Sequence, residues 1–128
     1  MGYVSDRKHV KGRPRAKAGR SRQKIPGTMN RLEARYAEHL ETRRIAGQIA
    51  AYWYESMKFR LADKTWYTPD FMVMLADGEL QIHETKGGFV REDAIIKLKI
   101  TSATYWCFRV FRVTEGPVRQ FTVAEVPS

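Results

Sequence analysis

The sequence has few of the residues that would cross-link it or carry it into a membrane. Cys107 is the only cysteine among 128 residues, which excludes an internal disulfide and every zinc site built from several cysteines. We expect this lone cysteine to be a small buried hydrophobe. No apolar run approaches the roughly 18 residues that a membrane-spanning helix needs. The first 30 residues also lack the apolar stretch of a secretory signal. We therefore expect no membrane partner and a protein that stays inside the cell that makes it.

Acidic residues are nearly absent from the first 24 positions, where nine Lys or Arg face only Asp6, a net charge of +8. The other 104 residues carry 14 basic and 13 acidic groups. We interpret residues 1–27 as a basic tail that is disordered when free and binds nucleic acid, because each basic group beside a phosphate releases counterions. A solubilising tail and a membrane-surface arm are the alternatives. The candidate DNA contacts in the tail are Arg13, Arg15, Lys17, Arg20, Arg22 and Lys24.

Residues 28–128 predict one folded domain in which helices and strands alternate. Helical periodicity, with Leu32, Tyr36, Ala37 and Leu40 on one stripe, runs from Asn30 to Gly47. Strand-like segments follow at 51–61, 66–75 and 79–86, then a helix from Val90 to about residue 103, and strands at 106–113 and 118–126. The order is typical of an α/β (α+β) domain around a mixed sheet.

The dipeptide Asp77-Gly78 between two apolar segments predicts a hairpin. With a two-residue loop, Asp70 lies opposite Thr85 and next to Glu84 and Lys86. Strand alternation also places Glu84 and Lys86 on the same face as two apolar residues, where charged groups need partners. The sequence therefore predicts that two carboxylates and an ammonium group converge at one end of this hairpin.

Two converging carboxylates form a hard oxygen site that suits Mg²⁺ or Mn²⁺. Such an ion promotes phosphodiester hydrolysis by activating water and by stabilising charge on phosphoryl and leaving oxygens. Lys86 beside it would hold or deprotonate the attacking water, or stabilise the developing negative charge. The sequence does not choose between these roles.

Tyr67-Thr68-Pro69-Asp70, followed after the hairpin by Glu84-Thr85-Lys86, resembles the motif of the PD-(D/E)xK nuclease superfamily, which has a restriction-endonuclease-like αβββαβ core. This resemblance implies that Asp70, Glu84 and the backbone carbonyl of Thr85 bind the metal. It also implies that Glu33, an acid on the first helix, completes the catalytic site. A capping box with Asn30 accounts for Glu33 almost as well.

Three stretches, 30–36, 67–71 and 83–87, are most similar to small bacteriophage proteins grouped with Holliday-junction resolvases. The resemblance extends from residue 28 to about residue 115. It implies a Mg²⁺-dependent endonuclease that cuts branched DNA as a homodimer in the cytoplasm of a bacterial host. The alternatives are a nicking or restriction-like nuclease, a nuclease of phage replication intermediates, and a nucleic-acid-binding module without activity.

The remaining candidates are single residues. Lys97, on the second predicted helix, would reach DNA phosphates or the active-site cleft, or lie on a solvated helix face. Trp53, Trp66 and Trp106 are predicted to be core residues rather than base-stacking platforms. His83 is predicted to be a packing or surface residue rather than a metal ligand.

Overall fold

The computed structural model of the chain describes residues 27–87 and 92–127. Two helices and seven strands occur in this part: α2 (Arg31–Ile45), β1 (Ile49–Tyr54), β2 (Phe59–Ala62), β3 (Thr65–Tyr67), β4 (Phe71–Leu75), β5 (Leu80–Lys86), α3 (Glu92–Thr104), β6 (Arg109–Glu115) and β7 (Phe121–Glu125). Neither helix is long and apolar enough to cross a membrane. The tail candidates Arg13, Arg15, Lys17, Arg20, Arg22 and Lys24, and the predicted helix start at Val90, lie outside the described residues.

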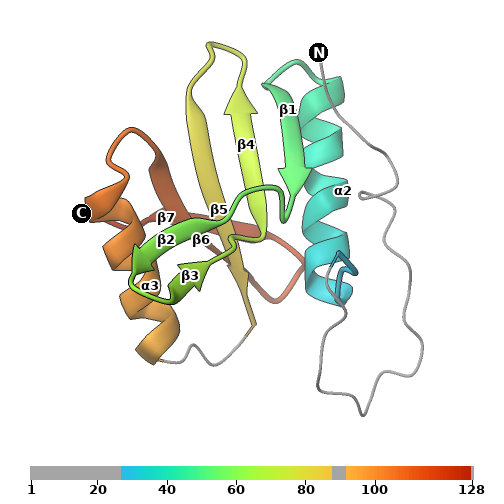
Figure 1. Ribbon diagram of the computed structural model, residues 1–128. Coiled ribbons are helices and arrows are strands. Elements are labelled where there is room, and N and C mark those ends of the chain that lie inside the picture. Colours follow the sequence, from blue (N-terminus) through green and yellow to red (C-terminus); the bar gives the residue numbers. More distant parts are fainter. Residues whose placement is uncertain (1–26, 88–91, 128) are drawn as a thin grey trace.

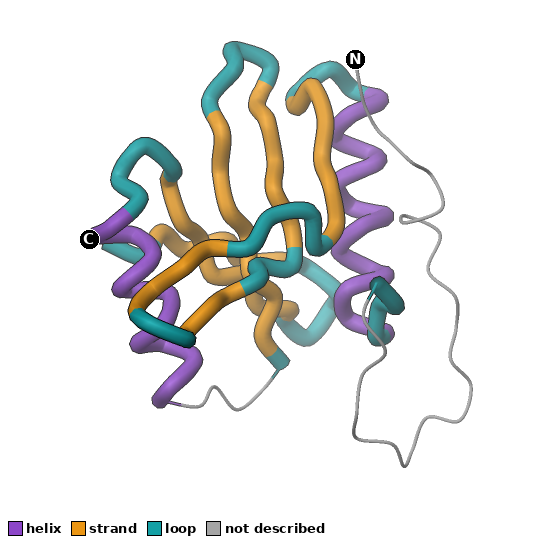
Figure 2. The backbone as a smooth tube through the Cα atoms, viewed as in Figure 1, coloured by secondary structure: helices purple, strands orange, loops and turns teal. Residues whose placement is uncertain are grey.

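A five-stranded mixed sheet in the order β1-β4-β5-β6-β7 forms the centre of the domain, and β2 with β3 forms a second, small sheet (Figure 1). Only the β5–β6 pair is parallel in the large sheet, and α3 makes the crossover that parallel neighbours need. Without the β2–β3 insertion the chain order is helix, three strands, helix, two strands, as predicted (Figure 2). The predicted α+β class is confirmed.

The helix α2 begins and ends where the sequence predicts. Asn30 caps its first turn, and Gly47 follows its end with a φ of +83°, a conformation that favours glycine. Tyr36, Ala37 and Leu40 are buried against one face of the large sheet, together with residues of β1 and β4. The opposite face of that sheet packs against α3 and the β2–β3 sheet. The core is therefore divided into two layers by the five-stranded sheet.

Two predicted strands are each divided between the two sheets, which corrects the sequence prediction. The segment 51–61 stops at Tyr54 and resumes at Phe59, and Glu55 between them has a φ of +49° that turns the chain away from the large sheet. The segment 66–75 is interrupted around Pro69, which has no N–H for a ladder hydrogen bond. The chain thus leaves the large sheet after β1, forms the β2–β3 hairpin and returns at β4.

The β4–β5 hairpin forms as predicted, but its register differs by one residue. Phe71 pairs with His83, so Asp70 falls opposite Glu84 rather than opposite Thr85. The loop has three residues, since the Leu75 N–H donates to the Glu79 carbonyl, and Gly78 adopts the positive φ that closes such loops. The extra loop residue shifts the pairing and leaves the predicted proximity unchanged.

Three predicted burials are wrong, and all three residues lie away from the large sheet. Trp66 is 46% exposed on the small sheet, and Trp106 is 80% exposed in the turn after α3. Cys107 is exposed in the same turn. The strand predicted at 106–113 begins only at Arg109 because α3 and its turn extend through this region, and the last strand begins at Phe121 rather than at residue 118. Trp53 does pack against the core.

A buried chain of hydrogen bonds joins α2 to the central strand β5. The Tyr36 hydroxyl donates to His83 Nδ1 at 2.6 Å, and His83 Nε2 lies 2.9 Å from Gln81 Oε1. His83 is almost completely buried, which fits the packing role and not the surface one among the two that the sequence left open. With one ring nitrogen accepting and the other donating, the neutral imidazole satisfies both partners.

We predict that His83 makes the fold sensitive to acid. Burial, assisted by the positive charges of Arg43 and His39, lowers the pKa of His83 to about 3. Between this pKa and the unfolded value near 6.5, the unfolded chain binds the extra proton, so stability falls as pH falls. The expected loss between pH 7 and pH 5 is about 2 kcal/mol.

Urea unfolding at a series of pH values tests this prediction, with His83→Gln as the comparison. The raised pKa of Asp70 acts in the opposite direction, and the comparison removes it because both proteins retain Asp70. The variant is expected to be less stable at pH 7 and to lose less stability on acidification. Parallel pH dependences of the two proteins would contradict the prediction.

Candidate active site

Asp70 and Glu84 meet where β4 begins and β5 ends. The Asp70 N–H donates to Glu84 Oε1 at 3.1 Å. Asp70 Oδ2 accepts hydrogen bonds from the N–H and the hydroxyl of Thr85, at 2.9 and 2.7 Å. Both carboxylates are buried, with 7% and 8% of their residues exposed. The hairpin therefore joins Asp70 to Glu84 through the Asp70 backbone N–H, and to Thr85 through the Asp70 carboxylate.

Lys86 lies on the same side of β5 as Glu84. Its Nζ is 3.1 Å from Glu84 Oε2, and the two side chains are 21% and 11% exposed. The simplest alternative explanation for Glu84 and Lys86 is an ordinary ion pair at the surface. The low exposure of both side chains argues against it. The three predicted catalytic groups, Asp70, Glu84 and Lys86, thus form one connected cluster.

The pairing register also determines the direction in which the backbone carbonyl of Thr85 points. The Thr85 N–H donates toward Asp70, and the N–H and C=O of one strand residue point to the same side, so this carbonyl faces β4 as well. Continued pairing places Pro69 opposite Thr85. Proline has no N–H to donate. The Pro-Asp dipeptide therefore supplies a carboxylate to the site. It also leaves the Thr85 carbonyl without a backbone hydrogen-bond donor from the β4 side.

Glu33 is positioned by α2 and serves as part of its capping box. The Asn30 N–H donates to Glu33 Oε1 and the Glu33 N–H donates to Asn30 Oδ1. The Tyr54 hydroxyl also donates to Glu33 Oε1, at 2.7 Å. Glu33 is only 4% exposed. The capping alternative is therefore present in the structure, and Glu33 contributes a buried negative charge as well.

These carboxylates influence one another. Burial, then the negative charges of Glu84 and Glu33, hold the pKa of Asp70 well above its usual range, against the hydrogen bonds from Thr85 that lower it. The site thus concentrates more negative charge than Lys86 balances. Such an arrangement is relieved by a bound cation.

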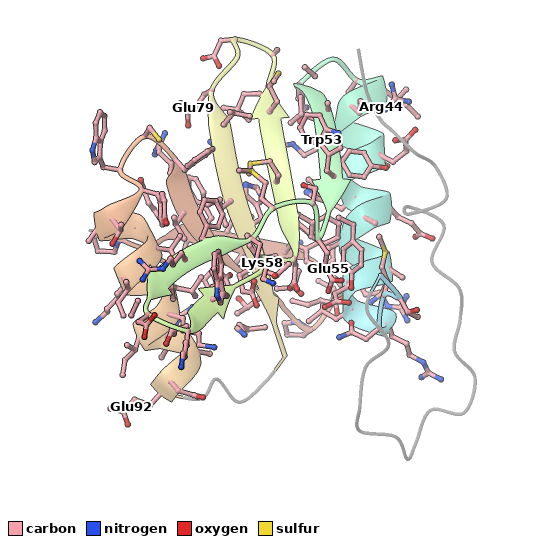
Figure 3. The ribbon with its side chains drawn as sticks, in the orientation of Figure 1. Arg44, Trp53, Glu55, Lys58, Glu79 and Glu92 are labelled. Carbon is pink, nitrogen blue, oxygen red and sulfur yellow. The ribbon has the colours of Figure 1, made fainter. Side chains whose placement is uncertain are left out.

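Sequence reasoning missed three residues that hold the acidic residues in place, two through a carboxylate and one through the backbone. The Tyr67 hydroxyl donates to Glu84 Oε1, and burial together with the Glu84 charge raises the pKa of Tyr67. Tyr54 holds Glu33 in the corresponding way. The Glu55 N–H donates to the Asp70 carbonyl, and Glu55 follows the end of β1 (Figure 3). No periodicity marks these contacts, although the positive φ of Glu55 is strain of the kind found at functional sites.

Lys97 lies half-buried on α3. Within residues 27–87 and 92–127, the hydrogen bonds and ion pairs of Asp70, Glu84 and Lys86 do not include it. In the same part of the chain, no three His, Cys, Asp or Glu side chains lie close enough together to hold a metal ion. The candidate ligands are thus two carboxylates and a backbone carbonyl.

Comparison of the chain with protein-family models, with curated proteins and with solved structures gave no match.

Proposed function

We propose that this chain is a metal-dependent endonuclease that hydrolyses phosphodiester bonds in DNA. The supporting observation is the buried cluster in which Asp70 and Glu84 touch and Lys86 pairs with Glu84 at 3.1 Å. A buried charged group costs free energy unless it has an oppositely charged or hydrogen-bonding partner. Ion pairs that serve only the fold are more often found at the surface. The basic tail agrees with a polyanionic substrate.

The donor set fits a divalent ion of the Mg²⁺ or Mn²⁺ type. Asp70, Glu84 and the Thr85 carbonyl offer only hard oxygen ligands, and waters commonly complete the shell of Mg²⁺. In the described part of the chain, both hydrogen bonds to the Asp70 carboxylate are accepted by Oδ2, so Oδ1 remains available. Burial and then repulsion from Glu84 and Glu33 raise the pKa of Asp70, and this repulsion is a further reason for a cation here.

When bound, such an ion activates a water molecule and neutralises phosphoryl charge. The protein's own groups have separate tasks in this proposal. Lys86, held by Glu84, stabilises the negative charge that develops on the phosphoryl oxygens. Thr85 fixes the orientation of Asp70, and Tyr67 fixes that of Glu84. Glu33 adds negative charge that acts on Asp70 rather than serving as a necessary ligand.

Branched DNA is the substrate class that we propose, with a four-way junction as the main target. Symmetric cutting of such a junction requires two active sites, and a homodimer with two-fold symmetry provides them. Lys97 and the tail are the proposed phosphate contacts outside the catalytic cluster.

Cleavage of a four-way junction, a flap and a linear duplex of the same sequence by the full chain, with Mg²⁺, tests this proposal. We expect the junction to be cut fastest and the duplex slowest. Equal rates on all three substrates would reject the preference for branched DNA. The proposal that the chain is a nuclease would still stand. No cleavage of any substrate in Mg²⁺ or Mn²⁺ would reject the nuclease itself.

We also predict that Tyr67→Phe lowers the cleavage rate about ten- to one hundred-fold, because outer hydrogen bonds orient groups that hold a metal. Tyr105→Phe is the matched control, since it removes a hydroxyl that donates to the Arg60 carbonyl away from the site. The rate at saturating Mg²⁺ and the Mg²⁺ concentration for half-maximal rate should both change for Tyr67→Phe. Equal behaviour of the two variants would show that Tyr67 does not position Glu84.

A further inference from the structure

The outer face of the β2–β3 sheet carries an aromatic side chain among basic ones. Arg60 and Trp66 are directly opposite each other in the register, whereas Phe59 pairs with Tyr67 on the alternate face. Phe59 is buried and Tyr67 reaches Glu84, so their face points inward. Trp66 and Arg60 therefore share the outward face, where both are exposed.

This face, which we call the hairpin face, is also positively charged. The Lys58 Nζ lies 5.3 Å from the centre of the Trp66 ring, in cation–π contact. Lys64 is exposed at the turn of the hairpin, where Asp63 is the only acid. Residues 58–68 therefore carry a net charge of +2, with three basic residues against one acid. Lys58 lies over the Trp66 ring, which remains 46% exposed, so the face offers a nucleotide both an indole surface for its base and cations for its phosphates.

The hairpin face adjoins the candidate active site. Tyr67, next to Trp66 in the strand, donates to Glu84, and Asp70 is four residues after Trp66. Four residues of extended chain span at most about 14 Å. The span from Trp66 to Asp70 is therefore at most about four steps of stacked bases, at 3.4 Å each. Figure 3 shows Lys58 on the connection between β1 and β2, in front of the large sheet.

We propose that Trp66 stacks on an unpaired base of the DNA substrate while Lys58 and Arg60 contact the flanking phosphates. This inference rests on the proposed nuclease function and names the feature of the substrate that is recognised. Base–aromatic stacking tolerates any sequence because every base has a π-face. Bases inside an intact duplex are already stacked on both sides, whereas a base in a gap, or one that leaves its pair at a branch point, becomes available. The hairpin face therefore selects DNA with unpaired nucleotides close to the cleaved bond.

Binding measured without divalent metal separates this inference from catalysis. The full chain is titrated in EDTA against a duplex and against the same duplex with a four-nucleotide single-stranded gap, each labelled for fluorescence anisotropy. Trp66→Leu is expected to weaken binding to the gapped DNA about ten-fold, within the roughly 5- to 150-fold range of one base stack. Binding to the intact duplex is expected to change less than about two-fold.

Trp106→Leu is the matched control because Trp106 is the other strongly exposed tryptophan, located in the turn after α3. It is expected to bind both DNAs like the wild type. Lys58→Gln supplies a second readout, since loss of one phosphate contact on a single strand reduces the salt slope by about 0.7. 2-Aminopurine placed in the gap should be quenched by the wild type and not by Trp66→Leu.

Equal binding of wild type and Trp66→Leu to gapped DNA would overturn the proposal. So would an equal loss on gapped and intact DNA, which would make the face a general contact, or retention of the 2-aminopurine quench. A nuclease that cleaves normally after Asp70→Asn would reject the active site and leave these binding results unaffected. The two proposals can thus fail separately.

Discussion

Asp70→Asn is expected to lower the rate of Mg²⁺-dependent DNA cleavage by on the order of 10³-fold or more while the fold remains intact. The amide keeps an oxygen to accept the hydrogen bonds from Thr85, so the local geometry persists. It removes the charge that a divalent ion needs. It also avoids burial of a charge and removes the repulsion from Glu84 and Glu33, the causes that raise the pKa of Asp70 in the wild type. The metal-free variant should therefore unfold at an equal or higher urea concentration than the wild type.

Asp77→Asn is the matched control for this substitution. Asp77 lies exposed in the loop at the far end of the same hairpin, where its carboxylate accepts from the Glu79 N–H. An amide oxygen accepts the same bond, so cleavage should proceed at the wild-type rate. Lys86→Ala should be as inactive as Asp70→Asn and less stable, because it leaves Glu84 buried without its cation. Wild-type cleavage by both Asp70→Asn and Lys86→Ala would refute the assigned site.

Deletion of residues 1–24 is expected to have the largest effect on DNA affinity. If the six tail residues Arg13, Arg15, Lys17, Arg20, Arg22 and Lys24 each neutralise one phosphate, the slope of log K against log salt becomes shallower by about 5. Affinity for duplex DNA at 100 mM salt should then fall at least about a hundred-fold. The proposed catalytic groups lie outside the deleted segment, so cleavage at saturating DNA should continue.

The control for the deletion keeps the length of the tail. Substitution of the same six residues by Gln should reproduce the shallower salt slope. A slope unchanged by either alteration would show that the tail does not touch phosphate. A loss of affinity with the deletion alone would indicate that chain length, rather than charge, is responsible.

Local signals in the sequence were enough to predict that Asp70, Glu84 and Lys86 lie together because these residues belong to one hairpin. The Asp77-Gly78 turn and the apolar strands on each side determine that the ends of β4 and β5 meet. The register was wrong by one residue because a two-residue loop was assumed, yet Asp70 and Glu84 are neighbours in either pairing. The α2 boundaries followed equally from the Asn30 cap and Gly47.

Contacts between distant segments were not predictable from the same signals. Tyr54 and Tyr67 hold Glu33 and Glu84 through pairs 21 and 17 residues apart, and only the fold brings them together. The exposure of Trp66 depends on β3 belonging to a separate small sheet, which the strand pattern did not reveal. Residue type alone favours burial of tryptophan, so this exposed position was the least expected feature.

The measurement that tests the central claim most directly is cleavage of a labelled four-way junction by the purified full chain, with Mg²⁺ or with EDTA, beside Asp70→Asn purified in the same way. We predict that the wild type cuts the junction in Mg²⁺, that EDTA stops cutting, and that the variant is inactive although folded. Cleavage that persists in EDTA or in the variant, or its absence from the wild type in both Mg²⁺ and Mn²⁺, would contradict the claim that Asp70, Glu84 and Lys86 form a metal-dependent nuclease site.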